Sequence, residues 1–128
     1  MKILGIGVDI VKNSRVSKSL KNNHFIKRIF SNTEILIANK IKDKKGYYSK
    51  RFAAKEAFAK ALGTGFRDGL NFKDIEVVND KLGKPYFVVS SKIKNLIKKK
   101  KKIKNFNLFL SISDEKEYSI AFTIIQAT

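Results

Sequence analysis

The sequence has no cysteine and no tryptophan, and only one histidine, one proline and one methionine in 128 residues. Without cysteine there is no disulfide, no cysteine-type zinc site and no thiol nucleophile. A single histidine, His24, argues against a histidine-based catalytic triad or a multi-histidine metal site. No apolar run reaches the ~18 residues of a membrane-spanning helix. We therefore expect a cytoplasmic protein with no membrane partner.

Acidic residues are also few: 11, against 28 lysines and arginines, which gives a formal net charge of +17. Such a field attracts polyanions, including nucleic acid, an anionic membrane, a phosphorylated ligand or an acidic protein. Because the lysines are scattered along the chain, charge alone selects none of these partners. The length and a hydrophobic content of 43% indicate one domain, 1–128, with a sizeable core.

The spacing of apolar residues predicts the order strand, helices, strands, helix and hairpin. Capping residues support the predicted helix starts: Asn13 or Ser14 precedes the first helix, and Ser31 and Glu34 match a capping box. This order indicates an α+β fold with a mainly antiparallel sheet. The expected helices cover 15–21, 31–42, a segment from Tyr47 or Ser49 to 62, and 91–97, before a frayed lysine run; the expected strands cover 3–10, part of 70–79, 86–89, 106–112 and 118–124.

The first strand carries Asp9 on the same side as Gly5 and Gly7. Two glycines beside an acid predict an open space next to a carboxylate. The alternative is an acid that simply ends the strand before the next helix. The residues alone leave both interpretations open.

A second acid lies in the central segment 52–66, FAAKEAFAKALGTGF, which favours a helix with Gly63 as its C-cap. Glu56 and Lys60 are four residues apart on this helix, among small residues rather than polar ones. Either they form an ordinary stabilising pair worth about 0.2–0.5 kcal/mol, or Lys60 and the turn at 63–65 meet a phosphate. Asp9 and Glu56 are hard oxygen ligands of the kind that hold Mg²⁺ with waters and substrate phosphates. The residues thus indicate a candidate magnesium–phosphate site.

At these same residues the sequence resembles a known family, the holo-acyl-carrier-protein synthases, which are the small bacterial branch of the 4′-phosphopantetheinyl transferases. The matching blocks are GIGVDIVKNSRV at 5–16, RFAAKEAFAKALGTGF at 51–66 and LSISDEKEYSIAF at 110–122, with GKP at 83–85 as a weaker marker. They span the chain in the family's order, and the central block is long and specific.

The resemblance implies the family's fold and its reaction in fatty acid biosynthesis. A serine hydroxyl of apo-acyl carrier protein attacks the β-phosphate of coenzyme A, takes up the phosphopantetheine arm and displaces 3′,5′-ADP. The family depends on Mg²⁺ and is typically trimeric, with each active site built between neighbouring subunits. We therefore expect a homotrimer that binds coenzyme A and acyl carrier protein.

Carried over residue by residue, the resemblance assigns Mg²⁺ to Asp9 and Glu56 and a coenzyme A phosphate to Lys60. Glu56, directly or through a metal-bound water, is also a candidate acceptor of the serine proton. Asp114 stands where many relatives have histidine, so a cationic contact at that point must come from a lysine or be absent. Further candidate residues for coenzyme A are Arg51, Gly63, Thr64, Gly65, Gly83, Lys84, Pro85 and Asp114, and those for the acidic carrier protein are Arg15, Lys18, Lys21 and Arg28.

Two other functions compete with this interpretation. The charge favours a small nucleic-acid-binding protein, but the sequence shows no helix-turn-helix and no RNP aromatic pattern, and aromatics do not interleave the lysine run. An inactive structural trimer is the second alternative, and the intact Asp9, Glu56 and Lys60 argue against it. We therefore expect an enzyme without a nucleic-acid partner.

Overall fold

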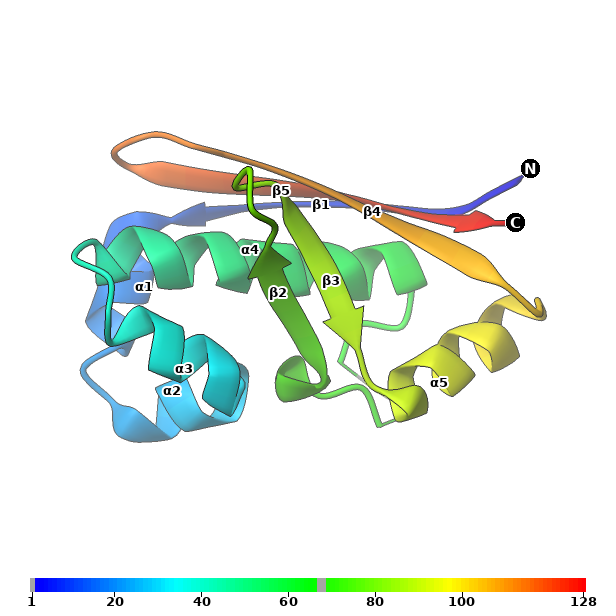
Figure 1. Cartoon of the computed structure of the whole chain (residues 1–128), viewed down its shortest axis with the longest axis horizontal. Helices are drawn as coiled ribbons and strands as arrows, with labels where there is room; N and C mark the ends of the chain where they lie inside the picture. Colours follow the sequence, from blue (N-terminus) through cyan, green and yellow to red (C-terminus); the bar gives the residue numbers. More distant parts are fainter. Residues whose placement is uncertain (1, 67–68) are drawn as a thin grey trace.

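The fold is organised around one long helix, α4 (Lys44–Leu62), which lies along one face of a three-stranded antiparallel sheet (Figure 1). The structure is a computed structural model and describes residues 2–66 and 69–128. The expected α+β fold with antiparallel sheets is confirmed. The other elements, in chain order, are β1 (Lys2–Lys12), α1 (Asn13–Ser19), α2 (Asn23–Ile29), α3 (Asn32–Ala38), the 3₁₀ turn η1 (Phe72–Asp74), β2 (Ile75–Asn79), β3 (Pro85–Val89), α5 (Ser91–Lys101), β4 (Phe106–Asp114) and β5 (Tyr118–Ala127).

The strands form two antiparallel sheets, one with the order β1-β5-β4 and a smaller one of β2 and β3. The central strand β5 places Phe122 opposite Val8 of β1 and opposite Ser111 of β4. Figure 1 shows the larger sheet on one side of α4, with α1 to α3 gathered near one end of the molecule and α5 near the other. The predicted hairpin of β4 and β5 is confirmed.

Helix α4 and strand β1 approach each other unusually closely. A Cβ atom placed on Gly7 would lie 1.9 Å from the backbone oxygen of Ala57, and one on Gly5 would lie 1.9 Å from that of Ala61. Gly5 and Gly7 therefore border no open space, because the backbone of α4 lies against them, and the open space beside Asp9 is a cavity on the side of α1. Glycine is needed here for close approach of two backbones.

Several helix boundaries differ from the prediction. Helix α4 begins at Lys44 rather than at Tyr47 or Ser49, because the Asp43 carboxylate accepts a hydrogen bond from Gly46 N (3.0 Å) and caps it earlier. The capping box of Ser31 and Glu34 is confirmed, but α3 ends at Ala38 instead of residue 42. Helix α5, capped by Ser90, continues through the lysine run to Lys101, where fraying had been expected.

Helix α1 begins at Asn13, which serves as a clamp instead of the predicted N-cap. The Asn13 side-chain amide donates hydrogen bonds to the backbone oxygens of Glu115 (3.1 Å) and Lys116 (3.2 Å), and its oxygen accepts one from Ser119 Oγ (2.8 Å). This buried asparagine ties the start of α1 to the β4–β5 turn.

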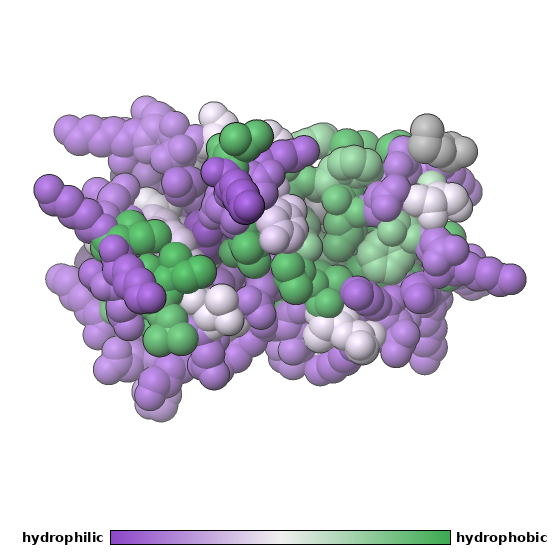
Figure 2. Space-filling model, in the orientation of Figure 1, coloured by the Kyte–Doolittle hydropathy of each residue, from purple (hydrophilic) through white to green (hydrophobic). Residues whose placement is uncertain are grey.

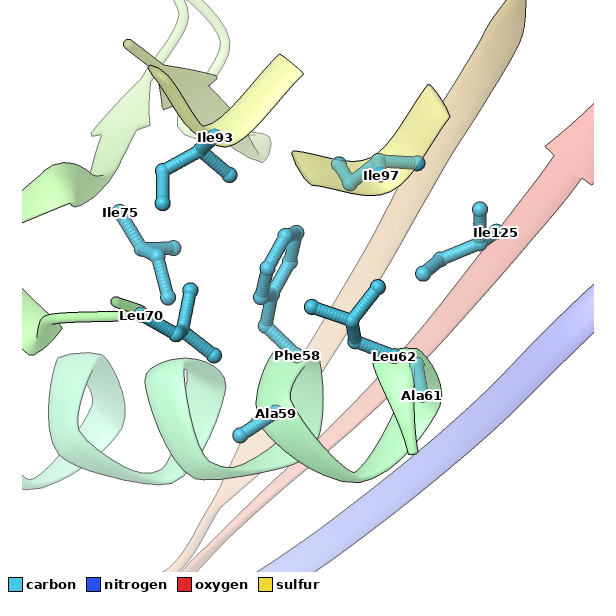
Figure 3. Packing of buried hydrophobic residues seen from close by; sticks show 9 residues of the cluster. All are labelled: Phe58, Ala59, Ala61, Leu62, Leu70, Ile75, Ile93, Ile97 and Ile125. Atoms are coloured by element: carbon cyan, nitrogen blue, oxygen red, sulfur yellow. The ribbon is translucent and has the colours of Figure 1, made fainter. Parts of the chain in front are cut away.

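The largest hydrophobic cluster lies between α4, α5 and the two sheets, with Phe58 at its centre (Figure 3). Residues from β2, α5 and β5 converge on it, so the cluster joins the two sheets through α4. Figure 2 shows hydrophilic side chains projecting at both ends of the same view. Among the described residues, no helix combines the length and the apolarity needed to cross a membrane. The buried members of the cluster are Phe58, Ala59, Ala61, Leu62, Leu70, Ile75, Ile93, Ile97 and Ile125.

Candidate functional site

The carboxylates of Asp9 and Glu56 line one cavity of about 370 Å³. Asp9 reaches it from the strand β1, and Glu56 from the middle of α4, which the glycine contact holds against that strand. The start of α1 closes a further side. The lining residues are Asp9, Ile10, Val11, Lys12, Arg15, Val16, Phe52 and Glu56.

The electrostatics of this cavity suit a cation. Partial burial raises the pKa of Glu56, and the negative charge of Asp9 raises it further, while Lys60 acts in the opposite direction. Among residues 2–66 and 69–128, no group of three or more His, Cys, Asp or Glu side chains could enclose a metal by itself. Two carboxylates in an open cavity instead match Mg²⁺, which commonly takes one or two carboxylates and leaves its other positions to waters and substrate phosphates.

Lys60 reaches across to β1 instead of pairing along its own helix. Its Nζ donates hydrogen bonds to Asp9 Oδ1 (2.9 Å) and to the backbone oxygen of Val8 (3.0 Å). No ion pair joins Lys60 to Glu56, two residues that the structure describes, so the ordinary intrahelical pair is not formed. The ammonium therefore sits at the edge of the carboxylate cavity.

A basic surface adjoins the cavity. Arg15 lines the carboxylate cavity and also a shallow pocket of about 290 Å³ along α1, which it shares with Lys18 and Lys21. Arg28 lies in a different pocket of about 580 Å³, together with His24 and other residues of α1 and α2. Among the residues that the structure describes, no acidic side chain lines either pocket. The structure thus brings Arg15 to the carboxylates, places Lys18 and Lys21 beside it, and holds Arg28 apart.

Arg51 belongs to a second group on the other side of α4. It is only 4% exposed, its guanidinium carbon lies 3.6 Å from the centre of the Tyr47 ring, and its NH2 donates a hydrogen bond to Asn79 Oδ1. The Asn79 amide in turn donates to the backbone oxygen of Gly83 (2.9 Å). The structure therefore links Arg51 to the turn at 83–85, and both lie near a cavity of about 480 Å³ that Arg51, Lys50 and Asn79 help to line.

This buried guanidinium is electrostatically under-compensated. Burial lowers the pKa of Arg51, against the opposing influence of Tyr47 and Glu34. Its Nε has no hydrogen-bond partner within the described part of the chain. A buried arginine in this state favours an anionic ligand, because a second charge-assisted hydrogen bond would offset its desolvation.

The remaining predicted residues lie elsewhere. Gly63 and Gly65 adopt positive φ angles of 88° and 62° after α4, and Thr64 Oγ1 donates to Gly65 O (3.0 Å). Asp114 ends β4 opposite Ser119, near the turn that Asn13 clamps. Neither group lines the cavity of Asp9 and Glu56. Within one chain the predicted residues therefore form separate groups.

A buried ion pair next to Glu56 was missed by the sequence analysis. Lys55 Nζ lies 2.8 Å from Glu34 Oε1 and donates to the backbone oxygens of Phe72 (2.9 Å) and Ile75 (2.6 Å). The Glu34 carboxylate also accepts backbone N–H groups, from Ser31 at one oxygen and Val77 at the other, both at 2.9 Å. Burial lowers the pKa of Lys55, and the Glu34 charge opposes that shift.

The signal for this pair was present but ambiguous. Lys55 stands between Ala54 and Glu56 in an alanine-rich helix, where a fully buried lysine requires a partner. Glu34 was already explained as the second member of a capping box, so nothing in the sequence suggested its second role.

Comparisons with known proteins bear on the family of the chain. A family model described as "4'-phosphopantetheinyl transferase superfamily" matches residues 5–123. A holo-[acyl-carrier-protein] synthase of Pelagibacter ubique is 71% identical over 126 residues, covering 98% of each chain. A crystal structure of the holo-[acyl-carrier-protein] synthase of Neisseria meningitidis superposes with a TM-score of 0.88 at 37% identity, covering 98% of this chain and 99% of that one. The Bacillus anthracis synthase in complex with CoA (3',5'-ADP) gives a TM-score of 0.82 at 35% identity, with 98% of both chains covered.

Proposed function

The chain belongs to the 4′-phosphopantetheinyl transferase superfamily and is an enzyme of its holo-[acyl-carrier-protein] synthase branch, and from this we propose that it uses Mg²⁺ to transfer phosphopantetheine from coenzyme A to a serine of apo-acyl carrier protein, with release of 3′,5′-ADP. The observation that carries the metal-dependent step is the shared cavity of Asp9 and Glu56. Two carboxylates from separate elements, with a lysine and an arginine at the edge, form a site for a cation and a diphosphate.

The metal-binding residues in this proposal are Asp9 and Glu56. When bound there, Mg²⁺ would neutralise charge on the diphosphate of coenzyme A. Glu56 has the further task of accepting the serine proton, directly or through a metal-bound water. Lys60 contacts a phosphate oxygen of coenzyme A. Because the nucleophile belongs to the carrier protein, the chain needs no cysteine or histidine for the reaction.

The nucleotide part of coenzyme A is proposed to meet the second group, Arg51 and the turn at 83–85. The under-compensated guanidinium of Arg51 supports an anionic ligand at this place. The separation of this group from Asp9 and Glu56 supports an active site completed by a neighbouring subunit. Gly63, Thr64 and Gly65 at the end of α4 are further candidates for phosphate contacts, and Asp114 remains a candidate at the hairpin.

The outer face of the larger sheet supports assembly of the chain into the proposed trimer. Cross-strand neighbours on this face are large and apolar, and they remain exposed in the single chain, with Ile6 at 58% and Ile10 at 60%. An apolar patch of this kind marks a surface that another protein covers. The exposed members on β1 and β5 are Ile3, Ile6, Val8, Ile10, Tyr118, Ile120 and Phe122.

Glu56→Gln provides the decisive test of the proposed activity. With coenzyme A, Mg²⁺ and an apo-acyl carrier protein, the unaltered enzyme should add the mass of a phosphopantetheine arm to the carrier. Glu56→Gln keeps the size of the side chain but removes a metal ligand, so we expect a loss of at least about 100-fold in rate, with an unchanged circular dichroism spectrum. Mass spectrometry of the carrier measures the rates of the unaltered enzyme and of the variant.

Two outcomes would count against the proposal. A variant that turns over at the normal rate would remove Glu56 from the metal site. An unaltered enzyme that retains nucleic acid tightly and never modifies the carrier would favour the nucleic-acid-binding alternative that the +17 charge raises.

Arg15→Glu tests the proposed docking of the carrier protein. Arg15 joins the carboxylate cavity to the basic surface of α1, and acidic partners are steered by such surfaces. Reversing this charge should raise the KM for the carrier about 10-fold or more while leaving the KM for coenzyme A within about twofold. The control is Lys40→Glu, which makes the same charge change at an exposed residue after α3. Equal losses for both substrates would contradict a docking role.

A further inference from the structure

Lys60 already holds one carboxylate oxygen of Asp9, the residue proposed to bind a divalent cation. Its ammonium lies 2.9 Å from Asp9 Oδ1 and 3.0 Å from the backbone oxygen of Val8. Both are hard oxygen atoms, the type that Mg²⁺ binds at about 2.0–2.1 Å. An ammonium and a dication beside the same carboxylate oxygen repel each other, so the lysine is a competitor for this position.

The two partners of this ion pair differ in exposure, and that difference shows which of them can move. The side chain of Asp9 is 14% exposed and belongs to a strand that pairs with β5 and packs against α4, whereas the side chain of Lys60 is 55% exposed. An exposed ion pair contributes little to stability, so the lysine can leave Asp9 at small cost. The carboxylate stays in place while the ammonium swings toward solvent.

We propose that Lys60 is an exchangeable placeholder: it neutralises Asp9 in the unliganded enzyme, leaves when a divalent cation binds, and then contacts the diphosphate of the bound nucleotide. The inference rests on the proposed function, because it assumes the metal site of Asp9 and Glu56. It adds a coupling between the two ligands. The diphosphate offers the displaced ammonium a new anionic partner, so metal and nucleotide bind more tightly together than either does alone.

The placeholder role predicts that a substitution in the candidate active site raises the metal affinity instead of lowering it. Lys60→Met removes the competitor, so the free enzyme should bind Mn²⁺, used as the probe, about fivefold or more tightly than the unaltered protein. Electron paramagnetic resonance of free Mn²⁺ measures this affinity without any turnover. Lys60→Arg keeps a cation at the position and should bind Mn²⁺ with nearly unaltered affinity.

The control for a general field effect is Lys12→Met. Lys12 lines the same cavity, but its ammonium forms no ion pair with Asp9 among the contacts between described residues. Because its ammonium holds no oxygen of Asp9, loss of its charge should act only through the screened field and change the Mn²⁺ affinity less than about twofold. An equal gain in both methionine variants would overturn the proposal, because the effect would then come from net charge alone.

The coupling gives a second, independent measurement. Adding coenzyme A should raise the Mn²⁺ affinity of the unaltered enzyme by a larger factor than that of Lys60→Met, in which no ammonium has to move. A Lys60→Met variant that binds Mn²⁺ no more tightly than the unaltered protein would overturn the placeholder role. That result would leave the proposed transferase activity standing, since the activity is tested separately through Glu56→Gln.

Discussion

Gly7→Ala is expected to lower the free energy of unfolding by at least about 3 kcal/mol, the upper part of the range for overpacked sites. The added Cβ would lie 1.9 Å from the backbone oxygen of Ala57. No side-chain rotation can relieve a contact with the helix backbone, so β1 and α4 must move apart. Urea unfolding followed by circular dichroism measures the loss.

The same displacement should weaken the candidate metal site. Asp9 follows Gly7 on β1, and Glu56 precedes Ala57 on α4, so the contact that the methyl group disrupts is the one that holds the two acids together. Mn²⁺ affinity should therefore fall even at temperatures where Gly7→Ala is still folded.

Gly63→Ala is the matched control. Its added methyl group would meet nothing within 4 Å, but φ at this residue is +88°, so only the left-handed conformation opposes alanine, at about 1–2 kcal/mol. If Gly7→Ala cost no more than Gly63→Ala, the close approach of strand and helix would be refuted.

Breaking the buried pair of Lys55 and Glu34 is the second change with a large expected effect. Lys55→Met leaves a carboxylate of 1% exposure without its cation, and removal of one member of a buried pair costs about 3–5 kcal/mol. Glu34→Gln should destabilise the fold for the opposite reason, because it leaves the buried Lys55 ammonium without its carboxylate. Since a domain of this size is stable by only about 5–15 kcal/mol, either variant should lose a large part of that stability.

The double variant separates charge imbalance from lost hydrogen bonds. In Lys55→Met with Glu34→Gln, neither side chain of the pair carries a charge, so the two costs should fall short of additive by about 2–3 kcal/mol. The double variant should still be less stable than the unaltered protein, because the backbone oxygens of Phe72 and Ile75 lose their donor. Strictly additive losses in urea unfolding would show that the two side chains do not act as a pair.

Much of the fold could be predicted because its signals are local. Alternation identified the β4–β5 hairpin, and the capping box of Ser31 and Glu34 identified the start of α3. Boundaries that depend on tertiary contacts were less predictable. Asn13 has the chemistry of an N-cap, and only the distant turn at residues 115–119 explains why its side chain is used elsewhere.

In the candidate site, too, the residues could be predicted from the sequence, whereas their tertiary contacts could not. The residue types and the family resemblance selected Asp9, Glu56 and Lys60, and the structure brings these three to one cavity edge. The glycines were misread because an open space and a close helix look identical in sequence: both require the absence of a side chain. The partner of Lys60 could not be predicted either. Glu56, four residues away on the same helix, was the obvious candidate, whereas Asp9 lies far away in the sequence.

The strand order has a consequence for protein synthesis. In the sheet β1-β5-β4, the only strand that pairs with β1 among the described residues is β5, which the ribosome makes after every other element of the described chain. The strand that carries Asp9 therefore has no strand partner until the last described strand has been translated. A nascent chain stalled before β5 therefore presents an unpaired β1 to chaperones, although the residues that line the cavity of Asp9 and Glu56 have already been made.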